Sequence, residues 1–364
     1  MTTPRVAIIG GGLAGLNAAR LLHRAGISFQ LFEARDRLGG RILTVDETGS
    51  PAEDGFDLGP SWFWPEMQPA IGNLVSELGL QAFAQYSTGD MLFERTAREG
   101  PSRLPGMTHQ PQSMRLASGS AALIRTLASG LPDGALNTGA AVTALHLTDF
   151  GIDVTVARDD QQPERISFNQ VIAALPPRLL ATVIRWDPAP DPATLDLWQG
   201  TPTWMAPHAK FFAVYDHPFW RDAGLSGTAQ SMVGPLAEIH DATTASGKAA
   251  LFGFVGIPAA QRKSIGPETL IRAAIQQLIR LFGPEAALPR ATLLKDWAAD
   301  ELTATSADVT AAGHPSAVGA EWVTGAWAGR LLLAGSEASA TEPGYLAGAM
   351  EASNRIVQAI CHRS

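Results

Sequence analysis

Two patterns of hydrophobic and polar positions recur along the chain, and they predict a protein that mixes helices with strands. Short apolar runs bounded by turn residues predict strands at residues 5–9, 27–32, 209–215, 249–255, 291–297 and 330–334. Longer segments whose apolar residues recur every three or four positions predict helices at residues 13–25, 267–282 and about 345–359. The order strand, helix, strand at the start is typical of α/β proteins with a parallel sheet.

A glycine-rich turn joins the first predicted strand to the first predicted helix. Gly10, Gly12 and Gly15 have the spacing GxGxxG. In dinucleotide-binding proteins the first glycine makes a tight turn, the second lets the backbone approach a pyrophosphate, and the third lets the helix pack on the strand. The N-terminus of the helix, at Leu13 and Ala14, would offer N–H groups and a positive dipole end to the phosphates.

An acidic residue stands where such a site needs one. Glu33 ends the second predicted strand, 18 residues after Gly15, and could accept hydrogen bonds from a ribose diol. A lone GxGxxG also fits an ordinary glycine-rich connection, but strand, glycine turn, helix, strand and acid occur here in order. The sequence therefore predicts a dinucleotide site.

The segment after Glu33 indicates which dinucleotide. A second glycine pair and three arginines follow within eight residues, and a nicotinamide enzyme has no need of them. They would offer a second backbone approach and cationic partners for a pyrophosphate; a charged loop with a turn is the alternative. The predicted contacts here are Glu33, Ala34, Arg35, Gly39, Gly40 and Arg41.

Together these segments resemble a known family. "GGGLAGLNAARLL" and "FEARDRLGGR" are similar to the glycine-doublet flavoproteins, specifically the flavin-containing amine oxidases. The resemblance continues at "DGFDLGPSW" (54–62), "LASGSAALIRTLASGL" (116–131), "VIAALPPRLL" (171–180) and "RLLLAGSEASATEPGYLAGAMEASNRIVQAI" (330–360). It spans the whole chain, is weakest in the middle, and implies FAD as the cofactor.

The resemblance also implies roles for residues outside the first motif. Gly59, Pro60, Ser61 and Trp62 would run beside the flavin, and the Val142 backbone would pair with the adenine. Ala174 would lie at the exit of a flavin-domain strand, and Trp297 in a flavin-facing segment. At the C-terminal motif, the implied contacts are Gly335, Ser336 and Glu337 along the ribityl and phosphate portion, and Gly344, Tyr345 and Leu346 at the ring. A packed core aromatic is the alternative for Tyr345.

The resembling segments alternate with others, which predicts discontinuous domains. The expected fold class is α/β, with a Rossmann-like FAD-binding domain and a mixed-sheet α+β substrate domain. The FAD-binding domain would take residues 1–75, 116–180 and 329–364, and the substrate-binding domain residues 76–115 and 181–328. The proline-rich stretch 187–192 would be a rigid connector between them.

One lysine is the candidate catalytic residue. Lys210 stands inside an apolar run, where a charge is costly unless it is paired or functional. A lysine that reaches solvent from a strand edge is the alternative. "K-x-x-x-x-Y-x-x-P-F-W" is similar to a family segment, which implies that Lys210 approaches the flavin N5 through water and assists reoxidation by oxygen. Tyr345 would form one wall of an aromatic substrate cage.

Several differences from the monoamine oxidases affect the expected flavin linkage and substrate pocket. "KDWAADELTATSADV" has no cysteine, with Ser306 or a neighbour in that region, so FAD is expected to be bound non-covalently. A second cage tyrosine is missing, and Trp62, Trp64, Trp204 or Trp297 could supply a wall or simply pack in the core. Asp300, Asp308 and His314 would hold a substrate ammonium or belong to a solvated loop. No clear arginine for an amino-acid carboxylate is present.

Composition excludes other classes of protein. A chain of 364 residues suggests about two domains, and a net charge of −8 argues against nucleic acid or an anionic membrane as partner. Cys361 is the single cysteine, which rules out an internal disulfide and a cysteine zinc site; no metal site is expected. No apolar stretch is long enough to span a membrane. We expect a cytoplasmic protein of undetermined oligomeric state.

The predicted function is FAD-dependent oxidation of a small amine to an imine, with oxygen as acceptor and hydrogen peroxide as product. Two alternatives stay open. One is a dehydrogenase or desaturase that acts on C–C bonds and passes electrons elsewhere, because one fold hosts both chemistries. The other is a non-catalytic flavin-binding protein.

Overall fold

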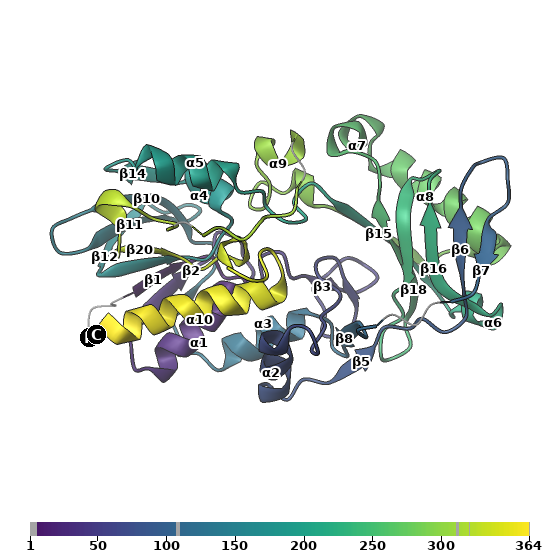
Figure 1. Ribbon diagram of the computed structural model, residues 1–364, viewed down its shortest axis with the longest axis horizontal. Helices are drawn as coiled ribbons and strands as arrows, with labels where there is room; N and C mark the ends of the chain where they lie inside the picture. The colour runs from purple at the N-terminus through teal and green to yellow at the C-terminus, as the bar shows by residue number, and fades with distance from the viewer. Residues whose placement is uncertain (1–5, 107–109, 311–312, 320, 364) are drawn as a thin grey trace. The chain divides into compact units, whose positions relative to one another are not determined.

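The computed structural model describes residues 6–106, 110–310, 313–319 and 321–363. Arg5, the first residue of the first predicted strand, lies outside them. The chain forms two compact units, each built from several segments (Figure 1). The first unit comprises Met1–Ile42, Leu123–Ala206 and Asp300–Ser364, and the second Leu43–Ala122 and Pro207–Ala299. Residues 43–75 and 116–122 thus pack in the second unit, and residues 181–206 and 300–328 in the first, which differs from the predicted domain boundaries.

The first unit is built on a parallel sheet of five strands. Their order is β20 (Leu331–Leu333), β13 (Gln170–Ala173), β1 (Val6–Ile9), β2 (Phe29–Phe32) and β9 (Leu136–Asn137). The central strand β1 is buried along its whole length and entirely apolar, as a strand covered on both faces must be. Helices α1 (Leu13–Arg24) and α10 (Leu346–Arg363) lie side by side (Figure 1), and the Asn17 amide donates to the Ser353 hydroxyl at 2.8 Å.

A second, four-stranded sheet completes the first unit. Its order is β12 (Glu164–Phe168), β11 (Ile152–Ala157), β10 (Ala141–Leu147) and β14 (Arg185–Asp187). Helices α4 (Pro177–Val183) and α5 (Pro192–Gly200) pack against each other, and the Trp198 indole is completely buried with the apolar face of this sheet. The other short helices of the unit are α9 (Ser306–Thr310), η3 (Gly325–Trp327) and η4 (Ser336–Ala338).

The second unit is built on a mixed sheet of seven strands. Their order is β19 (Ala291–Asp296), β15 (Ala209–Tyr215), β18 (Ala249–Val255), β17 (Leu236–Asp241), β16 (Leu225–Ser231), β6 (Asp90–Glu94) and β7 (Ser102–Leu104). Neighbours run antiparallel except β16 and β6, which are parallel. Strand β15 is buried at all seven positions and therefore occupies the interior of the unit.

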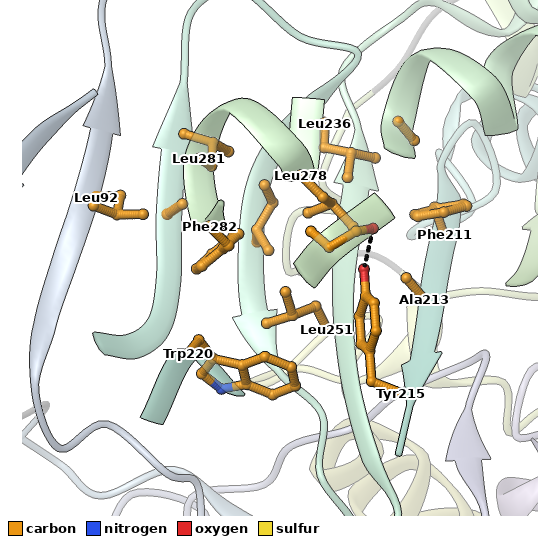
Figure 2. Close-up of a cluster of buried hydrophobic side chains, with 14 of the residues drawn as sticks. Leu92, Phe211, Ala213, Tyr215, Trp220, Leu236, Leu251, Leu278, Leu281 and Phe282 are labelled. Atoms are coloured by element: carbon orange, nitrogen blue, oxygen red, sulfur yellow. Dashed lines mark hydrogen bonds between the residues drawn. The ribbon is translucent and has the colours of Figure 1, made fainter. Parts of the chain in front are cut away.

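The two faces of this sheet have different partners because successive side chains of a strand point in opposite directions. On one face Phe211, Ala213 and Tyr215 pack with the apolar side of helix α8 (Pro267–Phe282), and the Tyr215 hydroxyl donates to the Ala286 carbonyl (Figure 2). On the other face Phe212 and Phe252 pack with residues of the segment 45–58. The second face also carries Lys210.

The remaining elements are short. They are β3 (Thr44–Val45), β4 (Phe56–Asp57), α2 (Pro69–Glu77), β5 (Ala82–Ala84), β8 (Met114–Leu116), α3 (Ala121–Ser129), α6 (Phe219–Asp222), α7 (Ala259–Ile265), η1 (Pro284–Ala287) and η2 (Trp297–Ala299). Among the helices of the described chain, none has the length and apolar character needed to cross a membrane.

The predicted α/β fold class, with one parallel and one mixed sheet, is confirmed. Strands β15 and β18 and helix α8 have the predicted bounds. Other elements differ at their ends: β2 begins at Phe29, two residues late, and β19 stops at Asp296 because Trp297 begins a 3-10 turn. Such shifts are ordinary at element ends.

Candidate cofactor site and active site

The residues predicted to hold the dinucleotide gather at one edge of the parallel sheet. Gly10, Glu33 and Ala174 directly follow β1, β2 and β13, and Gly335 follows β20 after one residue. Since these four strands are neighbours and parallel, their carboxyl ends share an edge. Ligands of open α/β sheets bind at that edge.

Glu33 is tied directly to the glycine turn. The Gly11 N–H donates to Glu33 Oε2 at 2.7 Å, and the Arg35 N–H donates to Oε1 at 2.9 Å. The Ala140 N–H also donates to the Glu33 carbonyl at 2.9 Å, immediately before the strand that contains Val142. The buried Glu33 carboxylate is thus oriented beside the glycine turn. Val142 lies two residues after Ala140, which is hydrogen-bonded to Glu33, so its backbone begins close to the same edge of the sheet.

Two glycine turns face each other at the start of helix α1. Gly12 and Gly39 form a backbone bridge, and the Gly39 N–H donates to the Gly11 carbonyl at 2.8 Å. A Cβ at Gly15 would collide with the Gly10 carbonyl oxygen, so that glycine is required by the packing of helix on strand.

Gly12 is different, and it provides a test of whether a cofactor fits. Its φ of −77° is open to any residue, and the nearest atom to an added Cβ would be the Gly39 oxygen at 3.8 Å. The protein itself therefore does not need a glycine at this position. Open backbone at the uncapped N-terminus of α1, beside a second glycine pair, fits the approach of a pyrophosphate.

The three arginines of the second turn each have protein partners. Arg35 Nη2 donates to Asp300 Oδ1 at 2.6 Å, and Arg37 donates to the carbonyls of Leu38, Gly40 and Ile42, which fixes the turn. Arg41 forms a two-pronged pair with Glu337, at 2.6 and 3.1 Å. Arg37 therefore shapes the loop, and contacts of Arg35 and Arg41 with a phosphate stay a prediction.

Glu337 is completely buried and remains ionised. Burial alone raises the pKa of this carboxyl, but the Arg41 guanidinium and the Ser336 hydroxyl outweigh it and hold the pKa below its usual range. The Arg41–Glu337 pair joins the second glycine turn to the 3-10 turn η4. It thereby links two of the predicted cofactor segments, 39–41 and 335–337.

An aromatic cluster forms in the first unit from three distant segments. The ring centroids of Trp204 and His314 lie 4.3 Å apart, and those of His314 and Tyr345 lie 5.2 Å apart. Trp204 and Tyr345 follow at 6.4 Å. Trp204 and Tyr345 are half-buried, so Tyr345 is not a sealed core aromatic. His314 is exposed in a segment without helix or strand, as the solvated-loop alternative expects, although its ring contacts both of the others. Leu346, the next residue, begins α10.

Lys210 lies within the second unit, on β15. Its Nζ donates to the Asp57 carbonyl at 3.1 Å, the Gly59 carbonyl at 2.6 Å and the Ser61 hydroxyl at 2.9 Å. The side chain of Lys210 is buried, with 4 % of the residue exposed, so the alternative that it reaches solvent from a strand edge is wrong. The structure thus brings Lys210 together with the predicted segment Gly59, Pro60, Ser61 and Trp62.

Burial sets the charge of Lys210. Loss of solvent lowers its pKa from 10.5 to about 7; the nearby Asp57 carboxylate opposes this change and Arg115 adds to it. Its Nζ also lies 4.6 Å from the centre of the Phe252 ring and 5.4 Å from that of Phe254. A lysine that changes charge near neutral pH is a candidate for proton transfer.

The predicted tryptophans around Lys210 have defined partners. Trp62 Nε1 donates to the Gln85 side chain at 2.8 Å, and Gln85 in turn donates to the Asp241 carbonyl at 2.7 Å. Gln85 also borders a cavity of about 510 Å³. Trp297 is buried and donates to the Leu58 carbonyl at 3.0 Å, so it fixes the backbone just before the Gly59 segment.

Two expectations about the segment before the last strand are corrected. Asp308 belongs neither to a solvated loop nor to a substrate-binding group, because it is buried and pairs with Arg178 at 2.8 Å. Although burial raises the pKa of Asp308, hydrogen bonds from Thr203, Thr305 and Arg178 leave it lowered. Asp300 instead pairs with Arg35.

The sequence reasoning did not single out two residues of β17 that lie on the same face of the sheet as Lys210. His240, on β17, meets the Trp62 ring edge at 4.8 Å and stacks on Phe252 at 5.3 Å. Glu238, two residues earlier, accepts a hydrogen bond from His240 Nε2 at 2.7 Å. Only the pairing of β17 with β18 brings them to this face, and that pairing has no motif in the sequence.

Comparison with known proteins identifies the family of the chain. The family model for flavin containing amine oxidoreductases matches residues 13–115 and 92–361. The chain is 25% identical to a probable flavin-containing monoamine oxidase A of Dictyostelium discoideum, covering 98% of this chain and 97% of the relative. It is 27% identical to a putative flavin-containing monoamine oxidase, AofH, of Mycobacterium tuberculosis, covering 97% and 95%.

Solved structures show the same fold. A redesigned putrescine oxidase superposes with a TM-score of 0.81 at 22% identity, covering 100% of this chain and 99% of that one. Cyclohexylamine oxidase from Brevibacterium oxydans IH-35A gives a TM-score of 0.80 at 21% identity, with 100% and 99% covered.

The family match covers nearly the whole chain and identifies a flavin-dependent oxidoreductase. The chain belongs to the flavin-containing amine oxidoreductase family. It is an FAD-dependent enzyme, so the predicted cofactor and enzyme class are confirmed. The individual site residues stay predictions.

Proposed function

We propose that this enzyme oxidises a small amine to an imine and is reoxidised by oxygen, with hydrogen peroxide as the product. When bound, FAD supplies the hydride acceptor. The carbon beside the nitrogen loses a hydride and the nitrogen a proton, which leaves the imine; the same two electrons and two protons reduce oxygen to peroxide. The observation that carries the proposal is Lys210, a buried lysine that ionises near neutral pH among aromatic rings.

The cofactor contacts that we propose are all non-covalent, and we assign them for each unit separately. In the first unit we assign Gly10, Gly12, Leu13, Ala14, Gly15, Glu33, Ala34, Arg35, Gly39, Gly40, Arg41, Val142, Ala174, Gly335, Ser336, Glu337, Gly344, Tyr345 and Leu346. In the second unit we assign Gly59, Pro60, Ser61, Trp62 and Trp297. The first unit is then the FAD-binding domain, and the second carries the substrate-binding sheet.

The role that we propose for Lys210 is proton transfer. In its neutral form its nitrogen donates two hydrogen bonds and accepts one, and the Ser61 hydroxyl at 2.9 Å can donate as well as accept. Both charge states of Lys210 therefore find partners in the same geometry. We propose that Lys210 assists reoxidation by moving a proton, while Phe252 and Phe254 exclude water from it.

A single substitution separates this role from substrate oxidation. Lys210→Met keeps most of the length and the apolar stem of the side chain and removes the titrating nitrogen. In stopped-flow experiments we expect flavin reoxidation to slow on the order of 100-fold, with a much smaller effect on reduction by amine. Lys263→Met, on the exposed surface of α7, is the matched control and keeps wild-type rates.

Unchanged reoxidation in Lys210→Met would overturn the role of Lys210. Peroxide measured during amine turnover tests the acceptor separately. Amine turnover without peroxide would replace oxygen with another acceptor and leave amine oxidation standing.

A further inference from the structure

We propose that Glu238 selects amines that carry a second positive charge, such as aliphatic diamines, by pairing with the nitrogen that does not react. This inference rests on the proposed function, because it takes the neighbourhood of Lys210 as the reacting end. It concerns a residue on the same sheet face, two strands away. Three observations within the second unit support it.

The first observation is register. Lys210 on β15 lies directly opposite Phe254 on β18, and Phe254 lies directly opposite Glu238 on β17. The three residues therefore form one row across the sheet and project from the same face. Two strand spacings separate the backbones of Lys210 and Glu238 by about 10 Å. A substrate that reacts near Lys210 would extend along this row over the Phe254 ring.

The second observation is the chemistry of this row and its neighbours. Trp62 lies 6.4 Å from the Phe254 ring and 4.8 Å from the His240 ring, measured between ring centroids. Aromatic faces attract cations and pack against aliphatic chains. Glu238 places a carboxylate at the end of this aromatic surface, where an ammonium group can be paired.

The third observation is how the carboxylate is presented. The Glu238 side chain is 48% exposed, whereas its partner His240 is 12% exposed. The hydrogen bond from His240 Nε2 at 2.7 Å orients the carboxylate, and His240 is itself fixed by stacking on Phe252.

Binding to the reduced holoenzyme tests the proposal without turnover. The flavin is reduced with dithionite, and dissociation constants for putrescine and n-butylamine are measured by calorimetry. These probes share a four-carbon chain and differ in the second ammonium. We expect Glu238→Gln to weaken putrescine binding by about tenfold or more and to leave butylamine binding nearly unchanged. Glu238→Asp keeps the charge and should retain most of the preference.

The matched control is Glu285→Gln, which removes one exposed carboxylate from η1, an element that packs with helix α8 on the covered side of the sheet. It should leave both dissociation constants unchanged. Equal weakening of the two amines by Glu238→Gln, or no effect on putrescine, would overturn the proposal. Failure of the proposed function is distinct: no amine would then reduce the oxidised flavin, whatever the binding preference.

Discussion

At the scale of single residues, the charge of Lys210 is decided by what surrounds it. Two backbone carbonyls and one hydroxyl hold its nitrogen, and the three rings nearby offer only weak compensation for lost water. The neighbouring Asp57 carboxylate accepts hydrogen bonds from Thr44 and Ser120 instead. Burial therefore dominates, and the lysine releases its proton near neutral pH.

This shift predicts a pH dependence of stability. The pKa of Lys210 is about 7 in the folded protein and 10.5 when unperturbed, so between these values unfolding takes up a proton. The free energy of unfolding should therefore rise with pH across this window, by up to about 1.4 kcal/mol per pH unit from this residue. This pH-dependent gain in the free energy of unfolding is complete above pH 10.5 and is absent below about pH 7.

Urea denaturation of wild type and Lys210→Met at several pH values measures this contribution. The difference between the two proteins should shift in favour of wild type as the pH rises from about 7. A difference that stays constant with pH would mean that Lys210 keeps its proton in the folded state. The control Lys263→Met should follow the wild-type curve.

At the scale of elements, the strand–turn–helix at the N-terminus separates two reasons for a glycine. An added methyl group at Gly15 meets the Gly10 carbonyl, whereas at Gly12 it meets only the Gly39 oxygen at 3.8 Å. We expect Gly15→Ala to destabilise the fold by about 1–3 kcal/mol. We expect Gly12→Ala to fold normally and to bind FAD more weakly.

Thermal unfolding of the apoproteins and FAD titration separate the two effects. A large loss of stability in Gly12→Ala would show that the glycine serves the fold. Unchanged FAD affinity in a folded Gly12→Ala variant would contradict the assignment of this turn to the pyrophosphate.

Some strands and helices could be predicted from the sequence because the interactions that form them are local. Strand β15, strand β18 and helix α8 have the predicted bounds, since continuous apolar runs and helical periodicity need no distant partner. The burial of Asp308 and its pairing with Arg178 could not be predicted in this way. Its partner Arg178 lies 130 residues away, and an isolated acid in a polar segment looks like solvated loop.

At the scale of the whole molecule, sequence motifs place some of the candidate site residues, and the register between strands places others. Residues that follow parallel strands could be placed from the sequence, because such strand ends share one edge of the sheet. The row from Lys210 to Glu238 depends on how β15, β18 and β17 pair, and no local pattern specifies that register. The cluster of Trp204, His314 and Tyr345 likewise comes from three separate segments.

The central claim is that this FAD enzyme takes its electrons from an amine. The most direct measurement is anaerobic mixing of the oxidised holoenzyme with a panel of primary, secondary and polyamines and amino acids, followed by flavin absorbance. We predict that at least one amine bleaches the flavin with saturating kinetics. If dithionite reduces the flavin normally but no amine in the panel does, amine oxidation by this enzyme is contradicted.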